Sequence, residues 1–170
     1  MRRNVDGQIQ MSFGMIFSII LIIAFIAFAF YAIKIFLNTQ NETQTGKFIN
    51  DFQADINRIW GGSVESSEEH EYSLPQKVSS VCFVDFSSGS QATATNTELF
   101  SELRRGYYGN ENMIFYPIGS SGIESKQINN IDIYLITQDE NPFCVQVIKG
   151  KLKLTLVKEF GGNGLVSVKR

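Results

Sequence analysis

The sequence has 170 residues, with 15 Lys and Arg, 17 Asp and Glu and one His, and its formal net charge is −2. Apart from an apolar stretch near the N-terminus, residues 38–170 suffice for one small domain, and their mild acidity argues against a nucleic-acid partner. The mean hydropathy of −0.03 hides an uneven distribution, because six of the fourteen Phe residues lie between Phe13 and Phe36.

The first predicted element is a transmembrane helix over residues 11–37. Between Gly7 and Ile33 no side chain is charged, and between Phe13 and Ile33 the only polar side chains are Ser18 and Tyr31. About 20 apolar residues in a helix cross the hydrocarbon core of a bilayer, whereas a helix at the surface of a soluble domain keeps a polar face. The sequence therefore predicts the lipid bilayer as the partner of this segment.

A cleaved secretory signal peptide is the first alternative. Its apolar region spans about 7–15 residues before a small-residue cleavage site. Residues 27–29, AFA, match such a site, but the apolar residues 30–37 follow them, so we expect the helix to be retained. Arg2 and Arg3 precede the helix, partly offset by Asp6, and the nearest basic residues toward and beyond its other end are Lys34 and the more distant Lys47. This distribution predicts a cytoplasmic N-terminus and a C-terminal part outside the membrane.

The residues before the helix resemble the class III signal segment of archaeal type IV pilin-like proteins. Arg2 and Arg3 are followed by Gly7 and then by residues 8–17, QIQMSFGMIF, which enter the apolar run. In that family a basic leader ends in Gly, a peptidase cuts beside it, and Gln-x-Ser-x-Glu opens the retained helix. The resemblance implies that residues 1–10 are a cytoplasmic leader that is cleaved between Gly7 and Gln8.

The match to the pilin-like pattern departs at defined positions. Gln10 and Ser12 fit the Gln and Ser of the family, but Gly14 stands where the family has Glu and Ser18 where it often has Leu. Cleavage beside Gly7 would leave Gln8 first, two residues out of register. A carboxylate inside a bilayer persists only when it is paired, and in pilins it is thought to pair with the terminal amine of a neighbouring subunit. This chain lacks that carboxylate, which leaves assembly by this ion pair in question.

Two other interpretations of the N-terminal segment stay open. It also resembles uncharacterised archaeal single-pass membrane proteins that begin in the same SFGMIFSIILII manner, and it fits an ordinary signal anchor. Gly14 and Ser18 form a small-x-x-x-small pair that lets two membrane helices approach closely. Such pairs also arise by chance in apolar helices.

Residues 38–62 are predicted to form a polar link and an amphipathic helix that ends at Gly61 and Gly62. Its apolar residues recur with helical spacing, and they are Phe48, Ile49, Phe52, Ile56, Ile59 and Trp60. Two arrangements are open: a single long helix that continues from the membrane segment, as in the pilin-like plan, or a break at Gly46 that separates an anchor from a second helix.

Residues 63–170 are predicted to form a β-rich head outside the membrane. Segments rich in β-branched and aromatic residues predict strands; they lie in residues 77–87, 113–118, 131–137, 143–158 (two strands around Lys149 and Gly150) and 165–169. Thr95 and Glu98 have the spacing of a capping box before a short helix that Gly106 ends. The expected fold class is α+β, in which one face of a small antiparallel sheet is covered by the amphipathic helix.

Few residues of the head have the pattern of a chemical site. Outside the cytoplasm Cys82 and Cys144 predict one disulfide, and the alternative is two buried thiols in a reducing compartment. His70 lies in an acidic, Ser-rich segment, expected to be a solvated loop, without a second ligand cluster for a metal or a nucleophile motif for a triad. Asn41 begins the one glycosylation sequon.

The sequence therefore predicts a protein that is not an enzyme and that has no cofactor and no metal. The first hypothesis is a pilin-like or cell-surface structural subunit whose single transmembrane helix also mediates packing with itself or with partners. The alternative is a monomeric membrane-anchored ectodomain that binds a ligand or serves as an accessory subunit of an envelope complex. An anchored enzyme is the third class, and no catalytic constellation supports it.

Overall fold

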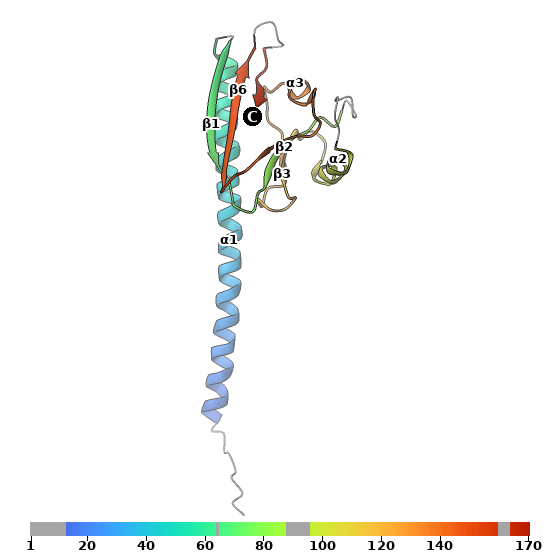
Figure 1. Cartoon of the computed structure of the whole chain (residues 1–170). Helices are drawn as coiled ribbons and strands as arrows, with labels where there is room; N and C mark the ends of the chain where they lie inside the picture. The colour runs from blue at the N-terminus through green and yellow to red at the C-terminus, as the bar shows by residue number, and fades with distance from the viewer. Residues whose placement is uncertain (1–12, 64, 88–95, 160–163) are drawn as a thin grey trace, which may run out of the picture. The chain divides into compact units, whose positions relative to one another are not determined.

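The computed structural model describes residues 13–63, 65–87, 96–159 and 164–170. Contacts divide the chain into two units, residues 1–38 and 39–170. Helix α1 (Phe13–Gly61, 49 residues) contributes to both units, and Gly46 does not interrupt it (Figure 1). Of the two arrangements that the sequence left open, the structure has the single helix, and the fold is α+β with antiparallel sheets.

In the first unit every described side chain of α1 is exposed, from Phe13 through Asn38. Large apolar side chains lie on all sides of this part of the helix, and their exposed fractions run from 40% at Leu21 to 84% at Phe13. A helix at the surface of a soluble domain has one apolar face on the core and one polar face in water, and this part of α1 has no polar face.

In the second unit α1 buries one side. The predicted stripe is confirmed at five positions, each at most 7% exposed: Phe48, Ile49, Phe52, Ile56 and Ile59. Trp60 is 47% exposed, so its assignment to the stripe is wrong. It lies in the last turn before Gly61, where the helix ends as predicted.

A three-stranded antiparallel sheet packs against this part of α1. Its strand order is β1 (Ser66–Ser73), β6 (Lys151–Lys158), β7 (Ser167–Lys169). Strand β6 alternates buried Leu152, Leu154 and Leu156 with outward-facing residues, as a strand with one covered face should. Strand β1 pairs with β6 over its whole length, from Ser66 opposite Lys158 to Ser73 opposite Lys151.

A second, four-stranded antiparallel sheet has the order β4 (Ser125–Lys126), β3 (Met113–Tyr116), β2 (Ser80–Phe83), β5 (Phe143–Gln146). Residues of this sheet alternate between two hydrophobic clusters. The larger cluster, shared with α1 and the three-stranded sheet, takes Val81, Phe83, Met113, Phe115 and Val145. The smaller one takes Cys82, Ile114 and Cys144 together with Leu99, Phe100 and Leu103 of α2. The predicted single sheet is therefore wrong, because the strands form two sheets.

Helix α2 (Thr97–Leu103) and the following 3₁₀ turn η1 (Arg104–Gly106) confirm the short helix predicted before Gly106. The capping box is corrected by one residue: the N-cap is Asn96, whose side-chain oxygen accepts a hydrogen bond from the Leu99 amide at 3.0 Å. Thr95 lies outside the described residues.

Two predicted local structures are wrong. Residues 131–137, expected as a strand, contain helix α3 (Ile133–Thr137), because Asp132 caps it by accepting a hydrogen bond from the Leu135 amide at 3.0 Å. The Ser-rich acidic segment around His70, expected as a loop, is strand β1. The two strands around Lys149 and Gly150 exist, but β5 and β6 belong to different sheets.

Lys158 ties the end of α1 to the three-stranded sheet. It is only 9% exposed, and its ammonium group donates hydrogen bonds to the carbonyl oxygens of Trp60 at 2.6 Å and Gly62 at 2.9 Å. A cation at the C-terminus of a helix satisfies carbonyls that have no partner within the helix and complements the helix dipole.

Candidate functional site

The most distinctive feature of the described chain is the exposed apolar surface of α1 from Phe13 to Leu37. It is the one described helix long and apolar enough to cross a membrane, and none of its most apolar window is buried. The 25 residues from Phe13 to Leu37 extend over roughly 37 Å at 1.5 Å per residue, which exceeds the ~30 Å of a hydrocarbon core. This length and composition are compatible with a single-pass anchor.

The predicted helix-packing pair lies within this surface. Gly14 and Ser18 are both exposed, and the Ser18 hydroxyl donates a hydrogen bond to the Gly14 carbonyl at 2.8 Å. The hydroxyl is therefore satisfied within its own helix, which removes the cost of an unpaired polar group in an apolar surrounding. The predicted cleavage residues Gly7 and Gln8 lie outside the described residues.

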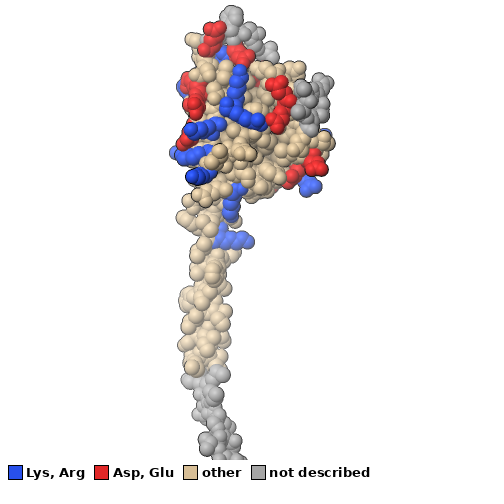
Figure 2. Space-filling model, in the orientation of Figure 1, with Lys and Arg blue, Asp and Glu red and all other residues tan. Residues whose placement is uncertain are grey.

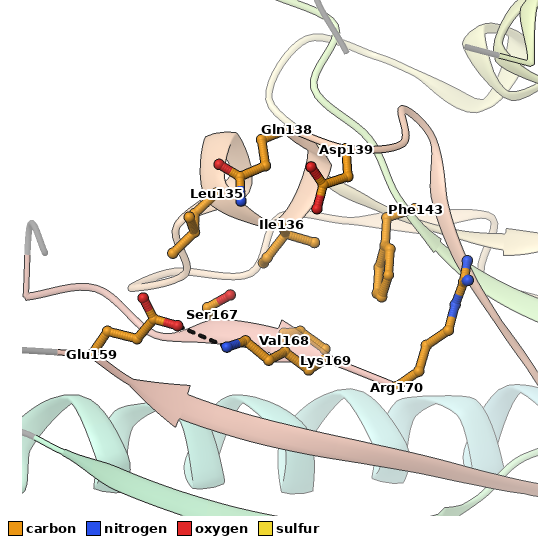
Figure 3. Close-up of a pocket in the computed structure, with 10 residues that line it drawn as sticks. All are labelled: Leu135, Ile136, Gln138, Asp139, Phe143, Glu159, Ser167, Val168, Lys169 and Arg170. Carbon is orange, nitrogen blue, oxygen red and sulfur yellow. Dashed lines mark hydrogen bonds and ion pairs between the residues drawn. The ribbon is translucent and has the colours of Figure 1, made fainter. Parts of the chain in front are cut away.

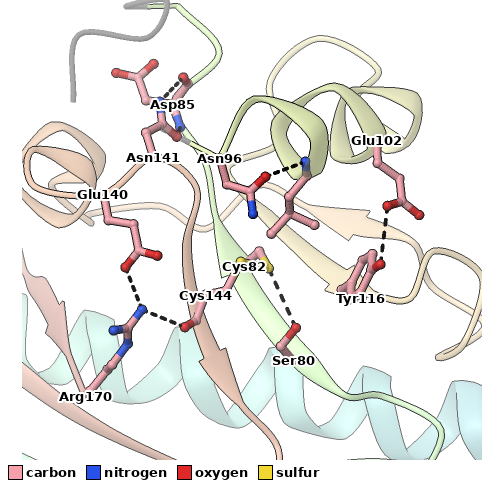
Figure 4. The surroundings of a disulfide bond; sticks show 11 residues. Ser80, Cys82, Asp85, Asn96, Glu102, Tyr116, Glu140, Asn141, Cys144 and Arg170 are labelled. Carbon is pink, nitrogen blue, oxygen red and sulfur yellow. Dashed lines mark hydrogen bonds and ion pairs between the residues drawn. A yellow bond between two sulfur atoms is a disulfide. The ribbon is translucent and has the colours of Figure 1, made fainter. Parts of the chain in front are cut away.

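The predicted disulfide between Cys82 and Cys144 is confirmed. Cys82 of β2 lies directly opposite Cys144 of β5, and the cross-link spans 62 residues of sequence (Figure 4). Cys82 is fully buried in the cluster that α2 covers. The Arg170 guanidinium donates to the Cys144 carbonyl at 3.0 Å and to the Glu140 carboxylate at 2.8 Å, which brings the end of β7 beside the cross-link.

A charged cluster joins α1 to the inner face of β1. Arg58 contacts Asp55 at 3.2 Å and Glu68 at 2.7 Å, and His70 lies 3.3 Å from each of these carboxylates. The Tyr72 hydroxyl donates to Asp55 at 2.8 Å. The hydrogen bond from Arg58 lowers the pKa of the Glu68 carboxyl, and burial, followed by the bond to Asp55, raises the pKa of Tyr72.

The geometry of β1 places the acidic neighbours of His70 on two faces of the strand. Glu68 and His70 point toward α1, whereas Glu69 and Glu71 point to the opposite, exposed face, because side chains alternate along a strand. In the described ranges no group of three or more His, Cys, Asp and Glu residues is arranged to hold a metal ion. The cluster thus serves to join α1 and β1 through compensated charges.

A pocket of about 310 Å³ lies between α3, β5 and β7 (Figure 3). Both basic groups of the pocket are paired: Lys169 contacts Glu159 at 2.7 Å, and Arg170 contacts Glu140 and lies 4.7 Å over the Phe143 ring. Asp139 also lines the pocket. The lining thus holds two acidic and two basic residues, and the pocket presents little net charge to a ligand.

A larger hollow of about 510 Å³ lies in the second unit. Its walls are the part of α1 just after residue 39, the end of β1 and the start of β6. We call it the lysine pocket; it is lined by Gln40, Asn41, Gln44 and residues 73–77 and 149–151. Three of the lining residues are Lys and none is acidic. In Figure 2, Lys and Arg side chains run down the middle and the lower left of this unit, and Asp and Glu side chains lie beside them on both sides.

The sequon residue Asn41 is one of the residues that line the lysine pocket. It lies within α1 and is half-buried. A glycan on this side chain would have to project through the pocket, and glycosylation of Asn41 stays a prediction. The pocket itself was not found from the sequence, because its three walls are far apart along the chain. The clearest local signal for one wall was the Lys149-Gly150 turn flanked by apolar strands.

The chain matches no protein-family model, no curated protein and no solved structure.

Proposed function

We propose that this protein is a non-catalytic subunit of a cell-surface structure, anchored by a single transmembrane helix over residues 11–37. The observation that carries the proposal is the change of surface along α1. From Phe13 to Ile33 the helix is apolar on every side, whereas from Thr45 onward it buries a single stripe against two sheets. An all-round apolar surface is stable in lipid and costly in water.

The proposed orientation has a cytoplasmic N-terminus and an extracytoplasmic head. Arg2 and Arg3 before the helix support it through the positive-inside rule. The Cys82–Cys144 disulfide supports it independently, because structural disulfides form and persist in oxidising compartments.

Within this class we favour a pilin-like subunit. One continuous helix that is apolar in its first half and packs on a sheet with its second half corresponds to the pilin-like plan. The basic leader before Gly7 agrees with processing beside that residue. In such an assembly Gly14 and Ser18 are the closest-approach face of the membrane helix.

The second candidate is a monomeric anchored ectodomain that serves an envelope complex as a binding or accessory subunit. Gly14 favours it, because the carboxylate that pairs with a neighbouring subunit's amine in pilins is missing at this position. The internal Ser18 to Gly14 hydrogen bond also leaves the isolated helix without an unsatisfied hydroxyl. Neither feature requires a second copy.

N-terminal sequencing of protein from native membranes tests the pilin-like form. We expect the mature chain to begin at Gln8, and an intact Met1 would argue against this form. Electron microscopy of sheared cell surfaces, with an antibody against the head, separates filaments from dispersed anchors.

Self-association provides a second test with a matched control. Gly14→Ile fills the closest-approach face, whereas Ala27→Ile adds similar bulk elsewhere on the same apolar helix. Energy transfer between labelled chains in bilayer discs should fall for Gly14→Ile and stay at the wild-type level for Ala27→Ile. Equal transfer in both variants would remove the packing role of Gly14.

A further inference from the structure

One wall of the lysine pocket is a tight hairpin turn that fixes Lys149. Ile148 and Lys151 exchange backbone hydrogen bonds of 2.9 and 3.0 Å across the turn, and Lys149 and Gly150 both have positive φ, 53° and 74°. Two left-handed residues are the signature of the two-residue turn that matches strand twist. The Leu74 amide donates to the Gly150 carbonyl at 2.9 Å, so the turn is held against the end of β1.

Gly150 is required at this position. A Cβ atom there would lie 3.0 Å from the Leu74 carbonyl oxygen, in addition to the strain of a positive φ. The close approach keeps the Lys149 backbone beside the segment that carries Lys77, in which the Val78 amide donates to the Pro75 carbonyl at 3.0 Å. Two lysines from distant parts of the chain are therefore placed on one rim.

The charges of this rim are only partly compensated. Lys151 contacts Glu71 at 3.3 Å and donates to the Ser73 hydroxyl at 3.0 Å. Lys77 and Lys149 are exposed and form no ion pair with any carboxylate in the described ranges. Two ammonium groups without acidic partners favour a multiply hydrogen-bonding anion such as a phosphate.

An exposed apolar side chain accompanies these lysines. Ile148 is 66% exposed and directly precedes Lys149, and it is the one exposed large aliphatic residue among the described residues of the second unit. An apolar tip beside basic residues is the pattern of segments that dock on an anionic lipid surface.

The opposite wall of the pocket follows the apolar segment closely along the chain. Gln40, Asn41 and Gln44 supply amide groups that donate hydrogen bonds. Gln40 follows Leu37, the last residue of the apolar run, by three residues. Three residues span at most about 11 Å of chain, and the headgroup layer of a bilayer is about 5–8 Å thick on each side.

From these observations we propose that the lysine pocket binds the phosphate headgroup of an anionic phospholipid in the membrane that holds α1. The proposal rests on the proposed membrane anchoring. Lys77 and Lys149 supply the charge, the amide wall supplies neutral donors, and Ile148 enters the apolar edge of the headgroup layer. Headgroup binding of this kind would hold the head against its own membrane.

Amine footprinting of the full-length chain in bilayer discs tests the proposal. The discs contain phosphatidylcholine alone or phosphatidylcholine with about one third phosphatidylglycerol, an anionic lipid. A brief pulse of an amine-reactive ester is followed by mass spectrometry of Lys77, Lys149 and Lys151. Lys169 serves as the internal reference, because it does not line the pocket.

We expect Lys77 and Lys149 to react about fivefold more slowly in the anionic discs, the factor that corresponds to the attraction of one lysine to an anionic surface. Lys169 should react equally in both discs. The protection should disappear at high salt, because salt screens exposed charges.

Two double variants separate a specific pocket from general attraction. Lys151 also lines the pocket, so a bound headgroup should slow its reaction as well. Lys77→Gln with Lys149→Gln should abolish this lipid-dependent protection of Lys151. Arg104→Gln with Arg105→Gln removes the same charge from exposed residues of η1, outside the pocket, and should preserve it. Equal loss in both double variants would overturn a specific site.

Three further outcomes would each overturn part of the proposal. Equal labelling of the three lysines in both kinds of disc, in protein that co-elutes with the discs, would overturn headgroup binding and leave the anchor intact. Protection by millimolar inorganic phosphate in phosphatidylcholine discs would replace the lipid by a free anion as ligand. A chain that does not co-elute with the discs would overturn the anchoring and the headgroup site together.

Discussion

Breaking the Cys82–Cys144 disulfide should destabilise the head by an amount that follows from its loop length. The cross-link closes 62 residues of sequence, and the chain-entropy relation gives about 4 kcal/mol at 25 °C for a loop of this size. Small domains have total free energies of unfolding of about 5–15 kcal/mol. We therefore expect the disulfide to contribute a large part of the stability of the second unit.

Pulse proteolysis in urea measures this loss on the full-length chain in detergent, because cleavage reports unfolding of the head whether or not α1 stays helical. Three samples are compared: oxidised wild type, reduced wild type and the C82A/C144A variant. We expect reduction to lower the free energy of unfolding by about 4 kcal/mol. The variant should lose slightly more, because Cys82 is fully buried and its truncation leaves a small cavity.

The control is the same reductant added to C82A/C144A, which should have no effect. A loss below about 1 kcal/mol on reduction of the wild type would refute the reasoning. It would mean that the reduced, unfolded chain keeps residual structure in this loop, so that the cross-link removes little entropy.

Three further predictions concern the interior of the second unit and use the same unfolding assay. Phe52→Ala, which removes a fully buried ring, should cost about 3–5 kcal/mol, whereas Trp60→Ala should cost less than about 1 kcal/mol; equal losses would contradict the packing described. Tyr72→Phe should cost about 1–2 kcal/mol at neutral pH through the lost hydrogen bond to Asp55. Because the pKa of Tyr72 is raised in the folded state, the stability that its neutral form contributes is complete below the unfolded-state pKa of about 10 and is lost as pH rises further. The difference in free energy of unfolding between the wild type and Tyr72→Phe should therefore shrink above pH 10. A difference that stays constant with pH would refute this. Lys158→Met should cost about 2–3 kcal/mol, because it removes the donor to two helix-end carbonyls, and an unchanged stability would show that water replaces it.

Much of the architecture followed from local patterns. The stripe from Phe48 to Ile59 was visible because its helical spacing is unambiguous. The end of α1 was visible because it coincides with the glycine pair Gly61 and Gly62. The turn at Lys149 and Gly150 was visible because left-handed residues favour Gly. The continuity of α1 through Gly46 was not, because a single Gly costs only about 1 kcal/mol in a helix and does not decide whether the helix breaks.

Other elements are determined by contacts that no local pattern displays. Strand β1 consists mostly of Ser and Glu, and it is a strand because it pairs over eight residues with β6 and contacts α1 through Asp55 and Arg58. Residues 131–137 alternate as a strand would, but the Asp132 cap and the pairing of Ile131 with Val166 favour a short helix after the bridge. A cap residue inside an alternating pattern was the signal that was missed.

The division of the strands between two sheets is a long-range property of the same kind. Strands β5 and β6 are separated by one tight turn, yet β5 pairs with β2 and β6 pairs with β1. The disulfide joins Cys144 of β5 to Cys82 of β2 and so belongs to one sheet. The lysine pocket arises from this arrangement, because its walls come from α1, the end of β1 and the turn before β6.

Extraction of native membranes with alkaline carbonate tests the central claim most directly. If residues 11–37 lie in the bilayer, the full-length or processed chain sediments with the membranes and is released only by detergent. Recovery of the intact, unclipped chain in the detergent-free soluble fraction would contradict the account.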